Sequence, residues 1–310
     1  MFRTKPSAPI PQKKNTKHFA VAIVWPRALI EMPSPAQAEK AKLFLSLHQG
    51  PRILVLPNAW DVASARIFED AGFPAIATTS SGIANSLGYP DGQVIGRDEM
   101  LEVVARIVRS VSVPVTADME AGYGKSPEDM AATARGVVEA GAVGLNLEDA
   151  IGEGSGELFE IAAQKEKIRA MIEAGKKKGV DLVLNARTDI YLEEIGEPST
   201  RAERTIERLN AYRDAGAACL FAPGVQDAAT IERLVRGVRG PLNILGRAGT
   251  PSVRELEKLG VARVSVGGGP MRVTMAVVSR IAKHLRDDGD FTVFAEVMPF
   301  VEANRLMPKR

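Results

Sequence analysis

Two carboxylates that stand two residues apart, Asp118 and Glu120, are the clearest chemical feature of this sequence. They follow an apolar run, residues 113–117, which is typical of a buried strand, and a glycine-rich turn at 122–124 comes after them. Residues two apart on a strand point to the same side, so both carboxylates are expected to face one site. Two converging acids repel each other, and a divalent cation is the simplest group that holds them together. The alternative is that one acid is solvated in a loop and the other caps a turn.

Polar side chains also follow other apolar runs, at positions where a strand would end. Together with the first pair, the candidates are Asn58, Asp91, Asp118, Glu120, Glu148 and Arg187. A set of oxygen ligands suits Mg²⁺, with Mn²⁺ as an alternative. The histidines, His18, His48 and His284, all lie away from these strand ends, so neither zinc nor an imidazole base is expected.

Arg187 is the candidate for binding the substrate, because a guanidinium holds a carboxylate in a forked geometry. An arginine beside a metal suits a small dianion such as an α-oxo acid, whose carboxylate and keto oxygens can both approach the cation. A structural ion pair between Arg187 and Glu148 is the alternative. For Asn58, a structural and a substrate-binding role both stay open.

Apolar runs that alternate with helix-like segments must position these residues. The expected strands are 53–56, 75–78, 113–117, 143–147, 182–186, 218–221, 242–245 and 263–266. The expected helices are 38–48, 62–71, 97–111, 127–140, 163–178, 200–215, 227–238, 252–259 and 271–287, with an additional C-terminal helix at 291–305. Eight such units in about 250 residues predict an α/β fold, a (β/α)8 TIM barrel, built as one domain from residue 37 to 310. A doubly wound open sheet is the rival, but no glycine-rich dinucleotide motif follows the first strand.

Composition limits the classes of partner and the compartment. The 310 residues contain 40 basic and 38 acidic side chains, which gives no electrostatic signature for nucleic acid. The single cysteine, Cys219, excludes a disulfide within the chain and indicates a reducing compartment, so a cytoplasmic protein is predicted. Residues 1–36 are expected to be a disordered or spurious extension. Their apolar run, 19–25, is too short to span a membrane, and Arg27 argues against a signal peptide.

Several motifs taken together resemble the isocitrate lyase/phosphoenolpyruvate mutase superfamily, in its phosphonomutase-like or 2-methylisocitrate lyase-like branch. The resemblance covers about residues 41–300, and the motifs are Thr78-Thr-Ser-Ser-Gly82, Ser86-Leu-Gly-Tyr-Pro-Asp91, Ala117-Asp-Met-Glu-Ala-Gly-Tyr-Gly124, Leu147-Glu-Asp149 and Asn185-Ala-Arg-Thr-Asp189. It implies an enzyme that makes or breaks a C–C or P–C bond beside an α-oxo acid, with Mg²⁺ stabilising an enolate. It also implies a homodimer or homotetramer in which a C-terminal helix is swapped between subunits.

The resemblance also implies roles for individual residues. Ser81 and Gly82 would hold the substrate through backbone N–H groups, and Arg187 would bind it. Asp91, Asp118 and Glu120 would form the metal cluster, partly through water. Glu148 would join the shell around that cluster.

The chain departs from the family pattern at several places, among them the residue near Thr79, where the tyrosine of the lyase branch and the tryptophan of the mutase branch are both missing. Glu120 replaces the second aspartate of the usual Asp-x-Asp pair. The lyase branch carries a Lys-Arg-Cys-Gly-His loop, whereas the loop at 151–158 here has no cysteine, lysine, arginine or histidine. Glu153 or Glu157 could carry a proton there, or could simply be solvated acids.

The sequence therefore favours a Mg²⁺-dependent carbon–carbon lyase acting on a small α-oxo or hydroxy dicarboxylic acid. The alternatives are P–C bond chemistry of the phosphoenolpyruvate mutase or phosphonopyruvate hydrolase type, a barrel that binds a phosphorylated ligand at residues 267–269, and a non-enzymatic relative.

Overall fold

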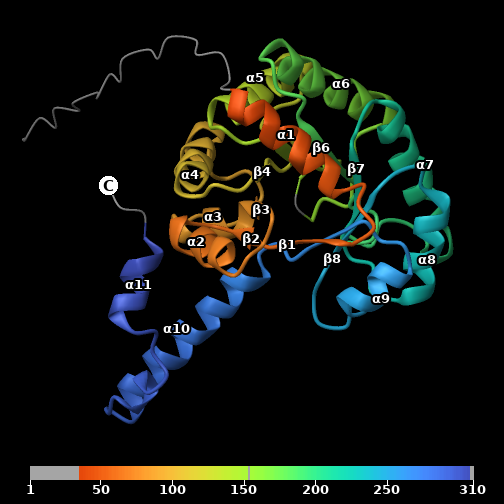
Figure 1. The fold of residues 1–310 in the computed structure, drawn as a ribbon. Helices are drawn as coiled ribbons and strands as arrows, with labels where there is room; N and C mark the ends of the chain where they lie inside the picture. The colour runs from red at the N-terminus through yellow and green to blue at the C-terminus, as the bar shows by residue number, and fades with distance from the viewer. Residues whose placement is uncertain (1–34, 153, 308–310) are drawn as a thin grey trace, which may run out of the picture. The chain divides into compact units, whose positions relative to one another are not determined.

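The computed structural model describes residues 35–152 and 154–307 and shows a nearly closed parallel barrel surrounded by helices (Figure 1). The strands are β1 Leu54–Leu56, β2 Asn58–Ala59, β3 Ile76–Thr78, β4 Val115–Asp118, β5 Gly144–Leu147, β6 Val183–Arg187, β7 Cys219–Ala222, β8 Leu242–Leu245 and β9 Arg263–Ser265. Their order is β1-β9-β8-β7-β6-β5-β4-β3-β2. The predicted barrel is thus confirmed.

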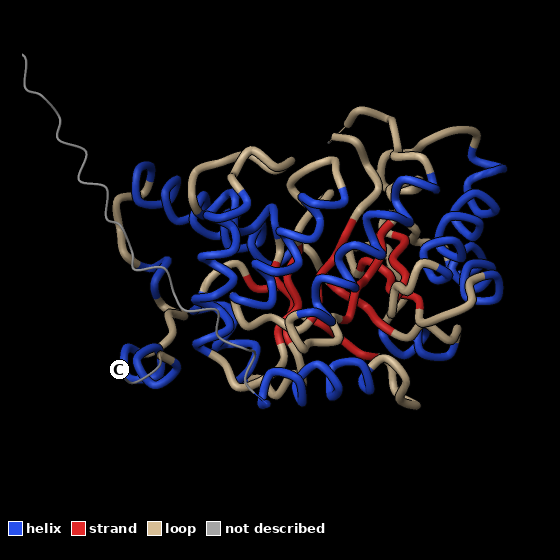
Figure 2. Tube along the Cα trace, turned by 90° about the horizontal axis from the view of Figure 1, so that it is seen from above, coloured by secondary structure: helices blue, strands red, loops and turns tan. Residues whose placement is uncertain are grey.

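The ninth strand arises because Pro57 divides the first predicted strand position into two short strands, β1 and β2. β1 pairs with β9, while β2 pairs with β3, so this divided strand joins the two edges of the sheet. Proline has no N–H to donate to a ladder, but the Pro57 carbonyl still accepts from the Ala77 N–H at 2.9 Å. Figure 2 shows the strands at the centre with helices around them.

The helices follow the predicted units with small shifts at their ends. They are α1 Pro35–Leu47, α2 Val62–Asp70, α3 Ser80–Ser86, α4 Arg97–Ser110, α5 Pro127–Glu139, α6 Ile161–Lys177, α7 Arg201–Asp214, α8 Ala228–Gly237, α9 Val253–Lys258, α10 Gly269–Asp287 and α11 Phe300–Leu306. Two short 3₁₀ helices, η1 Pro198–Thr200 and η2 Thr292–Phe294, complete the described elements. No helix among them is long and apolar enough to cross a membrane.

Three differences from the predicted elements have physical reasons. The short helix α3 was missed because its seven residues carry no apolar repeat. The C-terminal helix is present but was predicted too long, since Pro299 caps α11 and separates it from η2. Helix α1 begins at Pro35, two residues before the predicted domain boundary. The rest of the predicted N-terminal extension, residues 1–34, lies outside the described residues.

Local signals fix the connection that follows β4. Ser126 caps α5, accepts from the Asp129 N–H at 3.1 Å and forms a capping box with that residue, while Pro127 occupies the first turn. Gly122 has a φ of 98°, which only glycine adopts readily. A tight turn and a well-capped helix therefore hold the acidic segment 118–120 at the mouth of the barrel.

A buried polar residue, His48, directly follows helix α1. The Nδ1 atom lies 2.8 Å from the Phe44 carbonyl oxygen, and Nε2 is buried without a hydrogen-bond partner among the described residues. Burial, and secondarily the charge of Arg263, lower the pKa of His48 to about 4. The imidazole is therefore neutral in the folded protein at pH 7.

This neutral histidine predicts a sensitivity to acid. Between pH 4 and 6.5 the unfolded chain binds a proton at His48 that the folded chain does not, so the free energy of unfolding rises with pH across this window. The contribution is fully present above pH 6.5 and amounts to on the order of 3 kcal/mol. Urea unfolding at pH 4.5 and pH 7 should show a smaller pH difference for His48→Phe than for the wild type. Identical pH differences would contradict the assignment.

Candidate active site

A cavity of about 460 Å³ lies at the C-terminal ends of the strands. Its lining contains four acids and one guanidinium that the sequence or the structure marks as functional candidates: Asp91, Glu120, Glu148, Glu193 and Arg187. Catalytic groups of parallel barrels come from this end, because the loops after the strands converge there. The cavity is therefore the candidate active site.

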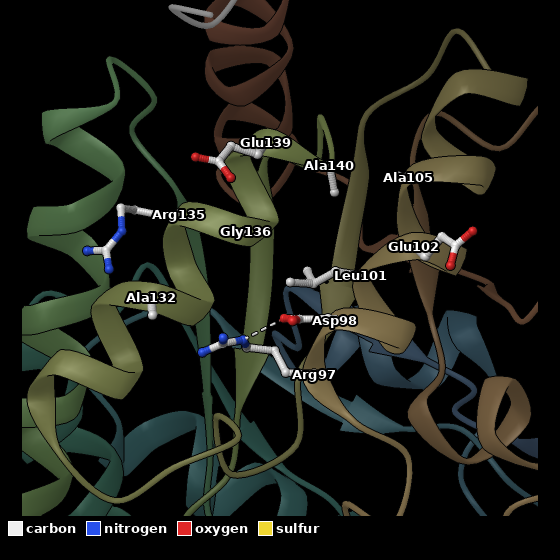
Figure 3. Close-up of a pocket in the computed structure, with 10 residues that line it drawn as sticks. All are labelled: Arg97, Asp98, Leu101, Glu102, Ala105, Ala132, Arg135, Gly136, Glu139 and Ala140. Atoms are coloured by element: carbon white, nitrogen blue, oxygen red, sulfur yellow. Dashed lines mark hydrogen bonds and ion pairs between the residues drawn. The ribbon is translucent and has the colours of Figure 1, made fainter. Parts of the chain in front are cut away.

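A second hollow, on the outside of the barrel between α4 and α5, is a poor candidate (Figure 3). Its floor is made of small side chains, including Ala105, Ala132 and Ala140, and its rim carries Arg135 and Glu139. Every lining residue belongs to the outer helices or the turn that follows α5, and none comes from a strand end. Nothing there combines converging acids with a buried guanidinium.

Asp118 is the last residue of β4 and is held firmly. Its Oδ2 accepts from the N–H and the Oγ of Ser80, at 3.1 and 3.0 Å, while its Oδ1 accepts from the Asn146 amide at 3.4 Å. The Asp118 N–H donates to Thr78 Oγ1 at 2.9 Å. Groups from β3, α3 and β5 thus fix this carboxylate next to Ser80, which itself lines the cavity.

Glu120 reaches the cavity by a different route from the one that the sequence predicted. It lies beyond the end of β4 and has a φ of 48°, so a left-handed turn, not strand alternation, directs its side chain. Its Oε2 accepts from the Gln93 N–H at 2.6 Å, and its Oε1 accepts from the Tyr123 hydroxyl at 2.7 Å. Burial, with further contributions from Asp118 and Asp91, raises the pKa of Glu120 to about 7.

The chemistry of these acids fits a hard cation. After burial, the negative charges of Asp91 and Asp118 also raise the pKa of Glu120, so the three carboxylates are close enough to interact. In the described part of the chain, however, no three acid, histidine or cysteine side chains stand close enough to form a ready metal cage. Mg²⁺ suits this arrangement, because it keeps several waters and needs few direct carboxylate ligands. The metal roles of the three acids remain predictions.

Arg187 and Glu148 form an ion pair in the lining of the same cavity. Arg187 Nη1 is 2.7 Å from Glu148 Oε2, and Arg187 Nε donates to Asp189 Oδ1 at 2.7 Å. Burial raises the pKa of Glu148 well above its usual range, although the charge of Arg187 opposes this shift. The ion pair that the sequence left as an alternative is therefore present. Both members also line the cavity, so the pair does not exclude a role in binding substrate.

Three other predicted substrate-binding residues lie outside the described cavity lining. Ser81 Oγ is 3.1 Å from Thr79 Oγ1, and the Gly82 N–H donates to the same oxygen at 3.4 Å, at the start of α3. Asn58 donates to the Thr78 carbonyl at 2.8 Å and accepts from the N–H groups of Val266 and Gly267, each at 2.9 Å. Asn58 thus holds the turn between β9 and α10. The substrate-binding roles of Ser81, Gly82 and Asn58 stay predictions.

The structure adds residues in or beside the cavity that the sequence did not assign a role. Ser80 holds Asp118, and Tyr123, from the glycine-rich turn, donates to Glu120. Glu193, which no motif marked, accepts from the N–H groups of Gly154 and Gly156, each at 3.1 Å. This carboxylate therefore anchors the loop between β5 and α6 over the cavity.

The same loop carried the two proton-transfer candidates. Its ends are joined by a bridge between Ala150 and Leu158. The side chain of Glu157 is exposed, while Glu153 lies outside the described residues. Glu157 is not part of the cavity lining, and the proton-transfer role of the two acids stays a prediction.

Comparison with known proteins supports the resemblance over most of the chain. A family model described as phosphoenolpyruvate phosphomutase matches residues 44–286. The 2-methylisocitrate lyase of Escherichia coli is 32% identical over 273 residues, which cover 84% of this chain and 87% of that protein. A solved structure from Burkholderia cenocepacia, provisionally described as a lyase/mutase, is 41% identical, with a TM-score of 0.82 and coverage of 87% and 96%. The structure of oxaloacetate acetylhydrolase in complex with the product oxalate is 25% identical, with a TM-score of 0.77 and coverage of 89% and 95%.

Proposed function

Since this chain belongs to the isocitrate lyase/phosphoenolpyruvate mutase superfamily, whose members are lyases and phosphonomutases, we propose that it is a Mg²⁺-dependent carbon–carbon lyase. Its substrate would be a small α-oxo or hydroxy dicarboxylic acid. One observation carries this proposal: the carboxylates of Asp91 and Glu120 and the guanidinium of Arg187 line a single cavity. Such a cavity can bind a cation on one side and a substrate carboxylate on the other.

The cation, held by Asp118 with Asp91 and Glu120, would supply positive charge for the enolate oxygen that forms when the C–C bond breaks. Arg187 would bind a substrate carboxylate and orient the bond to be cleaved. Cleavage of a hydroxy acid also requires a base for the hydroxyl proton. We assign proton transfer to Glu148, whose buried carboxyl has a raised pKa and lies beside Arg187. Mn²⁺ is an alternative cation for the same oxygen ligands.

P–C bond chemistry is the second candidate, because the matching family model is that of phosphoenolpyruvate phosphomutase. One set of assays separates the two. The purified protein with Mg²⁺ is incubated with a panel of α-oxo and hydroxy dicarboxylic acids and, separately, with phosphonopyruvate. Release of pyruvate or glyoxylate from the dicarboxylic acids supports C–C cleavage. The ³¹P resonance of phosphonopyruvate measures the second reaction. If phosphonopyruvate is converted and none of the dicarboxylic acids is cleaved, P–C bond chemistry would replace C–C cleavage as the proposed function.

The assembly that we propose is a homodimer or homotetramer in which the C-terminal helix is swapped. Helix α10 has no buried residue in the single chain, and Val273 and Val278 are 65% and 62% exposed. An apolar groove of about 790 Å³ runs between α10 and α2, lined partly by Trp60 and Phe68. An apolar surface of this kind is typical of a protein interface.

Charge placed on this surface should dissociate the assembly. In the double variant Val273→Lys/Val278→Lys, two ammonium groups would have to be buried without partners, which is costly. Light scattering after size exclusion should then give the mass of one chain, 33.2 kDa, in place of a multiple of it. Arg280→Ala, on the same helix but outside the lining of the groove, is the control. A double variant that keeps the wild-type mass would refute the proposed interface.

We further propose that residues 37–310 act as one catalytic domain and that the enzyme works in the cytoplasm. The first proposal is supported by the single ring of strands from β1 to β9. The second is supported by the one cysteine, Cys219, which is free and buried.

A further inference from the structure

Behind the cavity, a fully buried carboxylate, Asp149, is bound by two residues of helix α7. Asp149 Oδ2 accepts from the Tyr212 hydroxyl at 2.6 Å and lies 3.3 Å from Arg208 Nη1. Arg208 Nη1 also donates to the Tyr212 oxygen at 3.0 Å. Arg208 and Tyr212 stand four residues apart and therefore share one face of the helix. A buried acid with a charged and a neutral donor on the same oxygen is held in one orientation.

The other oxygen of Asp149 reaches toward the substrate-binding side of the cavity. Asp149 Oδ1 accepts from the Asp189 N–H at 3.0 Å, and Asp189 Oδ1 accepts from Arg187 Nε at 2.7 Å. Asp189 Oδ2 is buried without a hydrogen-bond partner among the described residues. The backbone bond to Asp149 is thus a principal constraint on where Asp189 sits. Because Asp189 Oδ1 accepts from Arg187 Nε, the same backbone bond also constrains the orientation of the guanidinium.

The same group joins the end of the loop that covers the cavity. The Phe159 N–H donates to the Asp149 carbonyl at 2.8 Å, and the Phe159 carbonyl accepts from Arg208 Nη1 at 2.8 Å. Phe159 follows directly on the bridge between Ala150 and Leu158 that closes this loop. One buried cluster therefore fixes two neighbouring parts of the mouth of the cavity, namely Arg187 and the loop after β5.

We propose that Asp149, Arg208 and Tyr212 are positioning residues that aim Arg187 at the substrate carboxylate. The inference rests on the proposed function, because it takes Arg187 as the group that binds that carboxylate. Tyr212 lies on an outer helix and is not part of the cavity lining, yet its hydroxyl sets the affinity for the substrate through Asp149 and Asp189. An arginine that is oriented in advance loses less freedom on binding than a mobile one.

The test compares the wild type with Tyr212→Phe, which removes one hydroxyl and keeps the ring. Calorimetry with oxalate in the presence of Mg²⁺ should show affinity weakened roughly 10-fold, within the range for residues that couple to a site through a network. Hydrogen exchange should be faster in a peptide that contains the Asp189 amide. Arg208→Lys, which keeps the charge but loses the planar guanidinium, should show both effects if Tyr212→Phe does not fold. Arg213→Lys is the matched control. Arg213 lies on the same helix, but it donates to the Ala217 carbonyl, which is not part of the cluster around Asp149.

Unchanged oxalate affinity and unchanged exchange at Asp189 in both α7 variants would overturn the positioning role. A wild type that binds no oxalate with Mg²⁺ would instead count against the proposed function. In that case the exchange of the Asp189 amide still decides whether the cluster holds the segment that carries Arg187. The two failures are therefore distinguishable in one set of samples.

Discussion

Replacing Asp118 by alanine should abolish Mg²⁺ binding, with a loss of affinity greater than roughly 100-fold. Asp118 is held at the mouth of the barrel by Ser80 on one oxygen and by Asn146 on the other. These contacts come from α3 and β5, and an alanine at this position makes neither of them. Calorimetry with Mg²⁺, and activity on whichever acid the wild type cleaves, measure the effect.

Two controls separate loss of the metal from loss of the fold. Asp118→Asn keeps an acceptor for Ser80 but removes the charge and the oxygen that accepts from Asn146, so it should fold and still fail to bind Mg²⁺. Glu128→Ala, an exposed acid on α5, should behave as the wild type. Wild-type Mg²⁺ affinity in Asp118→Asn would refute the assignment of this carboxylate as a metal ligand.

Arg187→Lys should lower kcat/KM by about 1,000-fold, or about 4 kcal/mol, because disrupting the hydrogen bonds of a buried charged group costs ~2–5 kcal/mol. A lysine cannot reproduce the two contacts of the guanidinium, with Glu148 at 2.7 Å and with Asp189 at 2.7 Å. The variant would leave these two acids with weaker compensation and the substrate carboxylate without a forked partner. Steady-state kinetics, with thermal unfolding as a check on the fold, give the result.

A second arginine at a strand end provides the matched control. Arg247 follows β8, is exposed, and donates to the Gly224 carbonyl and Gln226 Oε1, each at 3.1 Å. Arg247→Lys should retain kcat/KM within a few-fold of the wild type. Equal losses in both variants would show that Arg187 has no special role in binding the substrate.

The barrel could be predicted from the sequence because its signals are local. Short apolar runs, glycine after helices and the Ser126-Pro127 start of α5 each depend on residues close together in the chain. The same is true of the acidic segment, since Asp118 and Glu120 follow one strand. The last helix shows the limit of such reasoning, because the apolar spacing of 291–305 masked the interruption at Pro299.

The detailed site could not be predicted, because it depends on contacts between distant segments. The turn that directs Glu120 is a backbone feature with a φ of 48°, for which a glutamate gives no signal. Asn58 looked free for substrate but is bound to backbone groups of β3 and of the turn before α10. Asp149 and Tyr212 are 63 residues apart, and nothing in either local sequence indicates the bond between them.

Titration of oxalate into the wild-type protein, with and without Mg²⁺, tests the central claim most directly. Oxalate resembles an enolate in shape and charge, so a cavity that joins a cation to Arg187 should bind it tightly when Mg²⁺ is present and weakly when it is absent. Binding that is equally weak, or equally strong, in the two conditions would contradict the claim that these acids and this arginine hold metal and substrate together.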